Sequence, residues 1–226
     1  MATVELDVAL GPDEDPAWVA ANRLGPAIEA ARAIGAPAVR WWVEATADRH
    51  VEAAERAGLA PVRRLHQLWR PLPLEETTDL VTRPFRPGVD DDAWLAVNNR
   101  AFAWHPDQGG WTKETLQGRL AEPWFDADGF LLHEADDRLA GFCWTKVHDG
   151  EEPPLGEIYV IAVDPDFGGR GLGRALTLAG LRYLADRGLT VGILYVEADN
   201  APALALYESL GFTRHHTTTA FEAAFD

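Results

Sequence analysis

The sequence predicts an α/β (α+β) fold, and two stretches of its second half carry this prediction. In the first, an apolar run at 158–163 leads through a turn into the glycine-rich loop 168–173, which opens a helical pattern of apolar residues. In the second, an apolar run at 191–196 precedes a helix expected over 201–210. Strand, glycine-rich loop and helix in this order favour an anion site, because the first N–H groups of a helix are unpaired and glycines let a ligand approach the backbone.

The residues that flank the second helix fit its two ends. Asn200 is a typical N-cap, Pro202 suits the first turn and Gly211 suits the position just after the last turn. Two other phosphate motifs are excluded. The loop lacks the Lys-Ser/Thr ending of a P-loop, and no acidic residue ends a strand about 20 residues further on, as a dinucleotide site would require.

Together the two stretches resemble the GNAT superfamily of acetyltransferases. Its pattern is a [Gln/Arg]-x-x-Gly-x-[Gly/Ala] loop before one helix and Asn-x-x-[Ala]-x-x-x-Tyr-x-x-x-Gly-Phe over the next. The second part stands complete between Asn200 and Phe212, whereas in the first Gly168 replaces Gln or Arg. This departure removes a side chain but no backbone N–H group. The resemblance implies a GNAT fold, with a mixed and mostly antiparallel central sheet flanked by helices, and acetyl-CoA as co-substrate.

Composition narrows the partners of the 226-residue chain. A formal charge of −16 argues against nucleic acid or an anionic membrane surface and permits a cationic amine substrate. The single cysteine, Cys143, excludes an intrachain disulfide and fits a reducing cytosol. The sequence shows no leader, no long apolar run and no metal-ligand spacing. We therefore expect a cytoplasmic, monomeric enzyme that acts on a small-molecule amine without a metal.

An internal repeat divides the chain. Residues 10–59 align without a gap on residues 163–212, an offset of 153, and a period this long indicates domain duplication. We therefore expect residues 1–75 to form a degenerate partial GNAT repeat, preceding a complete catalytic GNAT domain at 76–226. The expected elements of the partial repeat are a strand at 4–10, a helix at 17–33, a strand at 39–44, a helix at 47–57 and strands around 61–70.

The first copy is degenerate where chemistry would occur. Its loop positions 15–20 contain no glycine, and Ala54 and Ala47 stand at the positions of Tyr207 and Asn200. We expect this copy to bind no CoA and to have a structural role, covering sheet edges. The front half of this copy is missing. The sequence leaves two explanations open, a true truncation and a start codon placed too late.

The second domain reads as a complete set of elements after a proline-bearing linker at 71–79. The expected elements before the glycine-rich loop are a strand at 81–86, a helix at 90–103, a helix at 112–121 capped by Thr112, strands at 130–133 and 139–147 joined by the Asp136-Asp137 turn, and the apolar strand at 158–163.

Three segments of this domain are similar to a narrower family. Segments 97–111, 141–148 and 156–160 look like the mycothiol synthase pattern of Asn-Asn-x-x-Phe-x-x-His-Pro-Glu-Gln-Gly-Gly-Trp, Trp-Thr-Lys-x-His and Gly-Glu-x-Tyr-Val. Asp107 stands where that family has Glu, which shortens its reach by one methylene. The resemblance implies acetylation of the cysteinyl amine of cysteinyl-glucosaminyl-inositol, the last step of mycothiol synthesis.

The same resemblance implies the site residues. Residues that match the family's substrate contacts are Asp107, Lys146, Glu157 and Tyr195. Residues that match its acetyl-CoA contacts are Ile161, Ala162, Val163, Gly168, Gly169, Arg170, Gly171, Leu172, Gly173, Arg174, Asn200, Ala203, Leu204 and Ala205, the last four within the segment from Asn200 to Ala205.

Residue chemistry suggests roles for a direct transfer, in which the amine attacks the thioester. Glu157 is a candidate base acting through a water, and Tyr207 is a candidate acid for the departing thiolate. Backbone N–H groups near Ile161 would polarise the thioester oxygen, while Lys146 and Asp107 could hold sugar and inositol hydroxyls.

Each assignment has an alternative. Glu157 could be a surface residue at a strand start, Tyr207 a core residue, and Lys146 and Asp107 solvated charges. The tryptophans Trp104, Trp111, Trp124 and Trp144 could line a sugar-binding face, although core packing is the commoner role. Two other functions also stay open, a GNAT enzyme for another small amine such as an aminoglycoside or amino acid, and a non-catalytic acyl-CoA-binding module.

Overall fold

A computed structural model describes residues 2–105 and 107–225, which form two compact units. Unit 1 contains the chain up to Leu68, together with Tyr195–Ala205 and the residues from Thr213 onward. Unit 2 contains Trp69–Leu194 and Leu206–Phe212. Among the described helices, none has both the length and the apolar character that crossing a bilayer requires.

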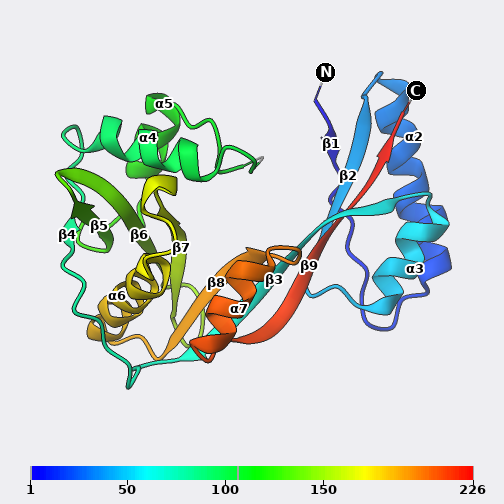
Figure 1. The fold of residues 1–226 in the computed structure, drawn as a ribbon. Coiled ribbons are helices and arrows are strands. Elements are labelled where there is room, and N and C mark those ends of the chain that lie inside the picture. Colours follow the sequence, from blue (N-terminus) through cyan, green and yellow to red (C-terminus); the bar gives the residue numbers. More distant parts are fainter. Residues whose placement is uncertain (1, 106, 226) are drawn as a thin grey trace. The chain divides into compact units, whose positions relative to one another are not determined.

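Unit 1 is a sheet covered by helices on one face (Figure 1). The strand order is β1-β2-β9-β3-β8, with β1 parallel to β2 and β2 antiparallel to β9. Its elements are β1 (Val4–Glu5), α1 (Pro16–Val19), a π-helical turn (Ala20–Leu24), α2 (Gly25–Ala33), β2 (Ala38–Val43), α3 (Asp48–Arg56), β3 (Ala60–Pro71), the end of β8 (Val191–Glu197) and β9 (Thr213–Ala224). The core forms around Trp41, which packs on Phe221 with ring centroids 5.8 Å apart.

Three expectations for unit 1 are corrected by the structure. The expected strand at 4–10 is β1 alone, because the carbonyls of Val8 and Ala9 accept hydrogen bonds from side chains, the Trp41 indole and the Arg23 guanidinium. The expected helix at 17–33 widens into a π-helical turn shortly before Pro26, whose missing N–H removes one ladder bond. The strands around 61–70 are one continuous strand, β3.

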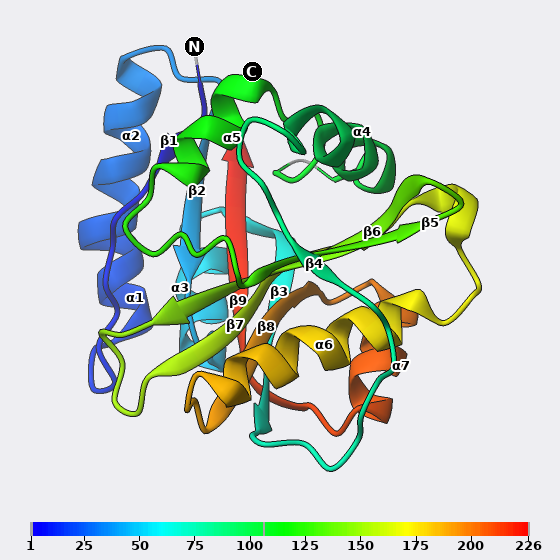
Figure 2. The same cartoon turned by 90° about the vertical axis from the view of Figure 1, so that its left-hand side faces the viewer.

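Unit 2 contains a mixed, mostly antiparallel sheet, as the resemblance to the GNAT superfamily implies. Its strand order is β8-β7-β6-β5-β4, and only β7 and β8 are parallel. Helices α4 and α5 lie on one face and α6 on the other (Figures 1 and 2). Its elements are β4 (Arg83–Pro84), α4 (Asp91–Ala101), α5 (Lys113–Leu120), β5 (Phe130–Ala135), β6 (Arg138–His148), β7 (Leu155–Val163), a 3-10 turn (Pro165–Phe167), α6 (Leu172–Asp186), the start of β8 and the end of α7 (Ala201–Ser209).

Short sequence features mark where several of these helices and strands begin or end. The Thr112 hydroxyl accepts a hydrogen bond from the Thr115 N–H and caps α5 as expected. Asp136 and Asp137 both adopt positive φ, 52° and 56°, the conformation of a two-residue hairpin turn. The expected strand at 81–86 is only β4, since Pro84 cannot donate to a ladder and is confined to an edge.

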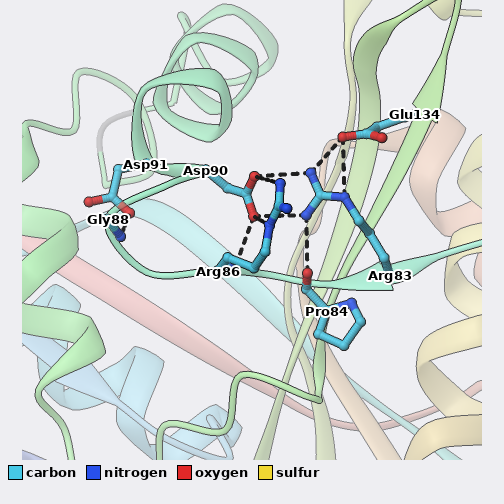
Figure 3. A network of polar contacts seen from close by, with 7 residues as sticks. All are labelled: Arg83, Pro84, Arg86, Gly88, Asp90, Asp91 and Glu134. Carbon is cyan, nitrogen blue, oxygen red and sulfur yellow. Dashed lines mark hydrogen bonds and ion pairs between the residues drawn. The ribbon is translucent and has the colours of Figure 1, made fainter.

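An ion-pair network joins β4 to the start of α4 and to β5 (Figure 3). Arg83 and Arg86 both bind the carboxylate of Asp90, and Arg83 also pairs with Glu134. Burial of Asp90 raises the pKa of its carboxyl, but hydrogen bonds from Arg86 and Arg83 outweigh burial and hold the pKa well below its usual range. The network therefore stabilises this edge only while Asp90 is ionised.

The internal repeat is present at the level of elements. Helices α3 and α7 differ by 153 at both ends, and so do strands β3 and β9. The glycines that end the helices match as well: Gly58 and Gly211 have φ of 78° and 75°, and Gly35 and Gly188 have φ of 74° and 85°. The two segments thus match in the positions of these elements, but residues 47 and 54 are alanines where the second segment has Asn200 and Tyr207.

Candidate functional site

The glycine-rich loop forms a helix N-terminus with open space beside it. Gly169 and Gly171 have φ of 76° and 77°, a region that favours glycine, and Gly171 is the N-cap of α6. The first hydrogen bond of the helix runs from the Ala175 N–H to the Gly171 carbonyl. A Cβ added at either glycine would meet no heavy atom of the described residues within 4 Å. The preceding first-turn N–H groups therefore face a space that an anion can enter.

Arg170 lies within this loop and Arg174 follows it. The Arg170 guanidinium lies 4.9 Å from the Phe167 ring centroid and 3.7 Å from the Asp136 carboxylate. Arg174, in the first turn of α6, donates a hydrogen bond of 3.1 Å to the Ser209 hydroxyl. Both add positive charge beside the N-terminus of the α6 dipole, so the residues present fit a phosphate-bearing ligand.

Strand β7 carries the expected backbone segment and an irregularity. Cys143, Phe142 and Gly141 of β6 pair in register with Ile161, Ala162 and Val163. The register then shifts, because Trp144 pairs with Val160 but Thr145 pairs with Ile158, which leaves Tyr159 as an extra residue. The bulge places Tyr159 beside the aromatic core that packs under α4.

Glu157 is a buried carboxylate at the start of β7. Its exposed fraction is 6%, and Lys146 lies directly opposite it on β6. The Oε2 atom of Glu157 lies 2.7 Å from the Nε2 atom of His148. A buried charge requires a partner, and His148 supplies one. His148 had no expected role, although its spacing of two from Lys146 on one strand was a visible signal in the sequence.

Lys146 is held by aromatic rings. Its ammonium lies 4.9 Å from the ring centroid of Trp124 and 5.7 Å from that of Tyr159. Cation–π attraction at this distance stabilises the ammonium. Lys146, His148 and Glu157 thus lie together on the sheet face that α4 covers, and they form a polar group at one end of that face.

Tyr207 is buried in unit 2. Its exposed fraction is 8%, and its ring packs against Phe212 with centroids 5.7 Å apart. Within the described part of the chain, no hydrogen bond to its hydroxyl is seen. Burial, and then the neighbouring Cys143 thiol, raise the pKa of the Tyr207 phenol above its usual range. The phenol therefore stays protonated at neutral pH and can act as a donor.

Asp107 is an exposed residue with hydrogen bonds to its neighbours on both sides. The Asp107 N–H donates to His105 Nδ1, and its carbonyl accepts from the Trp111 indole. Trp111 and Trp144 are buried in the aromatic core, the commoner of the two roles considered for these rings. Trp104 is exposed.

The remaining expected residues lie in unit 1. The Tyr195 hydroxyl accepts a hydrogen bond of 2.6 Å from the Gln67 amide, and 42% of Tyr195 is exposed. The Asn200 side chain accepts from the Ala203 N–H at 3.2 Å, as an N-cap does, and α7 continues through Leu204 and Ala205. In residues 2–105 and 107–225, no group of three or more His, Cys, Asp or Glu could hold a metal ion.

Comparison with known proteins identifies the fold family. Residues 94–212 match the model of the acetyltransferase (GNAT) family. The chain belongs to this family. It is 48% identical to the mycothiol acetyltransferase of Acidimicrobium ferrooxidans, over 94% of this chain and 72% of that protein. It is 52% identical to the mycothiol acetyltransferase of Thermomonospora curvata, over 82% of this chain and 63% of that protein.

A solved structure shows the same fold. The GCN5-related N-acetyltransferase from Sphaerobacter thermophilus superimposes with a TM-score of 0.67 at 24% identity, over 85% of this chain and 63% of that one. The GNAT resemblance and fold expected from the sequence are thus confirmed. By family the chain is an acetyl-CoA-dependent N-acetyltransferase, similar to mycothiol acetyltransferases, and it spans 63–72% of the length of the two relatives named.

Proposed function

We propose that this chain transfers an acetyl group from acetyl-CoA to the cysteinyl amine of cysteinyl-glucosaminyl-inositol. The relatives named as mycothiol acetyltransferases support the acceptor. The observation that carries the chemistry is the buried Glu157 carboxylate, which lies beside Lys146 and His148 at one end of the sheet face that α4 covers. A carboxylate in such a setting can deprotonate an ammonium ion, a step that the attack on a thioester requires.

Acetyl-CoA would bind along β7 and the start of α6. The loop from Gly168 to Arg174 would hold the pyrophosphate through backbone N–H groups, because Gly169 and Gly171 leave the space beside them open. Backbone groups of Ile161–Val163 would bind the pantetheine arm and polarise the thioester oxygen. Asn200 and Ala203–Ala205 would complete the site.

Glu157 and Tyr207 would divide the proton transfers of the reaction. Glu157 accepts a proton from the acceptor's ammonium through a water, which frees the nitrogen lone pair for attack on the thioester carbon. As the C–N bond forms and the C–S bond breaks, the Tyr207 phenol donates its proton to the leaving thiolate. Burial keeps the Tyr207 phenol protonated at neutral pH, as a proton donor must be, and its raised pKa makes it a weaker acid, so the developing thiolate charge has to drive the transfer.

Asp107 and Lys146 would hold the sugar and inositol hydroxyls of the acceptor, and Tyr195 would be a further substrate contact. The partial repeat at 1–75 would take no part in chemistry, since its loop positions lack glycine. We therefore expect one acetyl-CoA per chain, no metal, and a monomer that acts in the cytoplasm on a small molecule rather than on nucleic acid or a membrane.

Calorimetry with acetyl-CoA and a turnover assay on a panel of amines test this proposal together. Binding with turnover of cysteinyl-glucosaminyl-inositol supports it. Binding with turnover of an aminoglycoside or amino acid alone would instead indicate another small-amine acetyltransferase. Binding without turnover of any amine would indicate a non-catalytic acyl-CoA-binding module.

A further inference from the structure

The closest polar contact of Glu157 is with His148, and the two residues lie on neighbouring strands. Lys146 and His148 alternate on β6 and so share the face of Glu157, which stands opposite Lys146 on β7. Nevertheless, the 2.7 Å contact is made by His148, from the diagonal position. Strand register and one hydrogen bond therefore link the imidazole to the candidate base.

In the hydrogen bond between His148 and Glu157, the imidazole is the donor and the carboxylate is the acceptor. An ionised carboxylate can only accept hydrogen bonds, so the imidazole must carry its proton on Nε2 and donate it to Oε2 of Glu157. The hydrogen bond fixes one carboxylate oxygen and leaves the other, Oε1, for a water or an amine. The alternative tautomer, with the proton on Nδ1, would place two acceptors against each other.

Lys146 does not pair with Glu157 in the described part of the chain, although it lies opposite it on the neighbouring strand. A lysine opposite a buried glutamate is the expected ion-pair partner, but the Lys146 ammonium lies over the rings of Trp124 and Tyr159. Among the described residues, no ion pair joins Lys146 to Glu157. The ring contacts of Lys146 therefore leave His148 as the hydrogen-bond donor to the carboxylate.

We propose that His148 is a positioning residue for Glu157: its Nε2–H holds Oε2 of the carboxylate and so directs Oε1 toward the acceptor amine. The inference rests on the proposed function of Glu157 as the base. Hydrogen bonds from neighbouring residues commonly orient functional side chains in this way. A misplacement of such a side chain by about 1 Å can lower the rate by about 10².

The test is a double-mutant cycle with His148→Ala and Glu157→Gln, measured with the acceptor that the wild-type chain turns over. We expect His148→Ala to lower kcat by about 10- to 100-fold, with acetyl-CoA affinity and Tm nearly unchanged. In the Glu157→Gln background the same change should have an effect of less than about 3-fold, because no base remains to be oriented. His148→Gln, which keeps an N–H donor, should restore most of the lost rate.

Equal losses in both backgrounds would overturn the proposal, because a purely structural role acts regardless of Glu157. Normal turnover in His148→Ala would overturn it as well. The matched control is His133→Ala, which removes the imidazole that contacts the Val81 carbonyl from β5 and should leave turnover unchanged.

A second readout does not depend on turnover. Imidazole ¹⁵N spectra, assigned by the signals missing in His148→Gln, should show the His148 proton on Nε2 in the wild type. Loss of that preference in Glu157→Gln is also expected. A wild-type spectrum in which Nε2 carries no proton would overturn the proposal for His148. Because this readout needs no turnover, its outcome is independent of whether the chain acetylates an amine, which tests the proposed function.

Discussion

Replacing Gly171 by Asp tests the proposed pyrophosphate site against a matched control at the other end of the same helix. Gly171 precedes α6 with φ of 77°, and Gly188 follows it with φ of 85°. Added Cβ atoms at both positions meet no described heavy atom within 4 Å. Gly171→Asp and Gly188→Asp therefore impose similar backbone strain and add the same charge, but only the first places that charge beside the loop.

The expected effects can be worked out separately. Left-handed backbone conformation costs a non-glycine residue about 1–2 kcal/mol, which for a chain of this size lowers Tm by roughly 2–8 °C. The helix dipole favours Asp at the Gly171 end and disfavours it at the Gly188 end by about 0.3–1 kcal/mol, so the control should be the less stable variant. At about 5 Å and an effective dielectric constant of about 20, the carboxylate repels each phosphate charge by about 3 kcal/mol.

Calorimetry with acetyl-CoA distinguishes the two variants. A penalty of about 3 kcal/mol per charge predicts that Gly171→Asp weakens binding by at least about 100-fold, while Gly188→Asp keeps wild-type affinity despite its lower Tm. Gly171→Asn, which carries no charge and tolerates positive φ, should fall between them. Equal affinity in Gly171→Asp and Gly188→Asp would refute the location of the site, as would a wild-type stoichiometry of two.

Three further predictions concern single side chains. Glu157→Gln should lower turnover by about 10²–10⁴, with a deficit that shrinks at high pH where the amine is already neutral; a deficit independent of pH would remove Glu157 as the base. Tyr207→Phe should lower the rate of acetyl transfer by about 10²–10⁴ at nearly unchanged Tm. Tyr183→Phe, which removes the hydrogen bond to Asp126, should lower Tm and leave the rate intact. A Tyr207→Phe variant with a lower Tm and a normal rate would make Tyr207 a packing residue. Asp90→Asn should destabilise by about 2–4 kcal/mol at pH 7, against at most about 1 kcal/mol for the exposed Asp92→Asn, as denaturant unfolding can measure. Because the folded-state pKa of Asp90 lies below its ordinary 3.8, the wild-type advantage is complete above about pH 4 and is lost as pH falls through the folded-state pKa; an advantage independent of pH would contradict this.

Local signals made much of the fold predictable. The α7 helix was expected because Asn200 caps it and Gly211 ends it, and both features are present. The Asp136-Asp137 turn and the Thr112 cap were equally local. Each of these depends on residues within about one turn of one another, so sequence alone specifies them.

The site was harder to predict because it depends on register. The contact between His148 and Glu157 requires the pairing of two strands, and the bulge at Tyr159 changes that pairing. A shift of one residue would turn every side chain to the other face. For the same reason the sequence could not assign Trp144 to the core rather than to a sugar-binding face.

The central claim is that the chain acetylates a cysteinyl amine. It is tested most directly by kcat/KM for cysteinyl-glucosaminyl-inositol compared with glucosaminyl-inositol, with the acetylated atom identified by fragmentation of the product in a mass spectrometer. The proposed function predicts turnover of the cysteinyl compound alone, with the acetyl group on the cysteinyl nitrogen. Equal turnover of both compounds, acetylation of the sugar amine, or no acetylated product would contradict it.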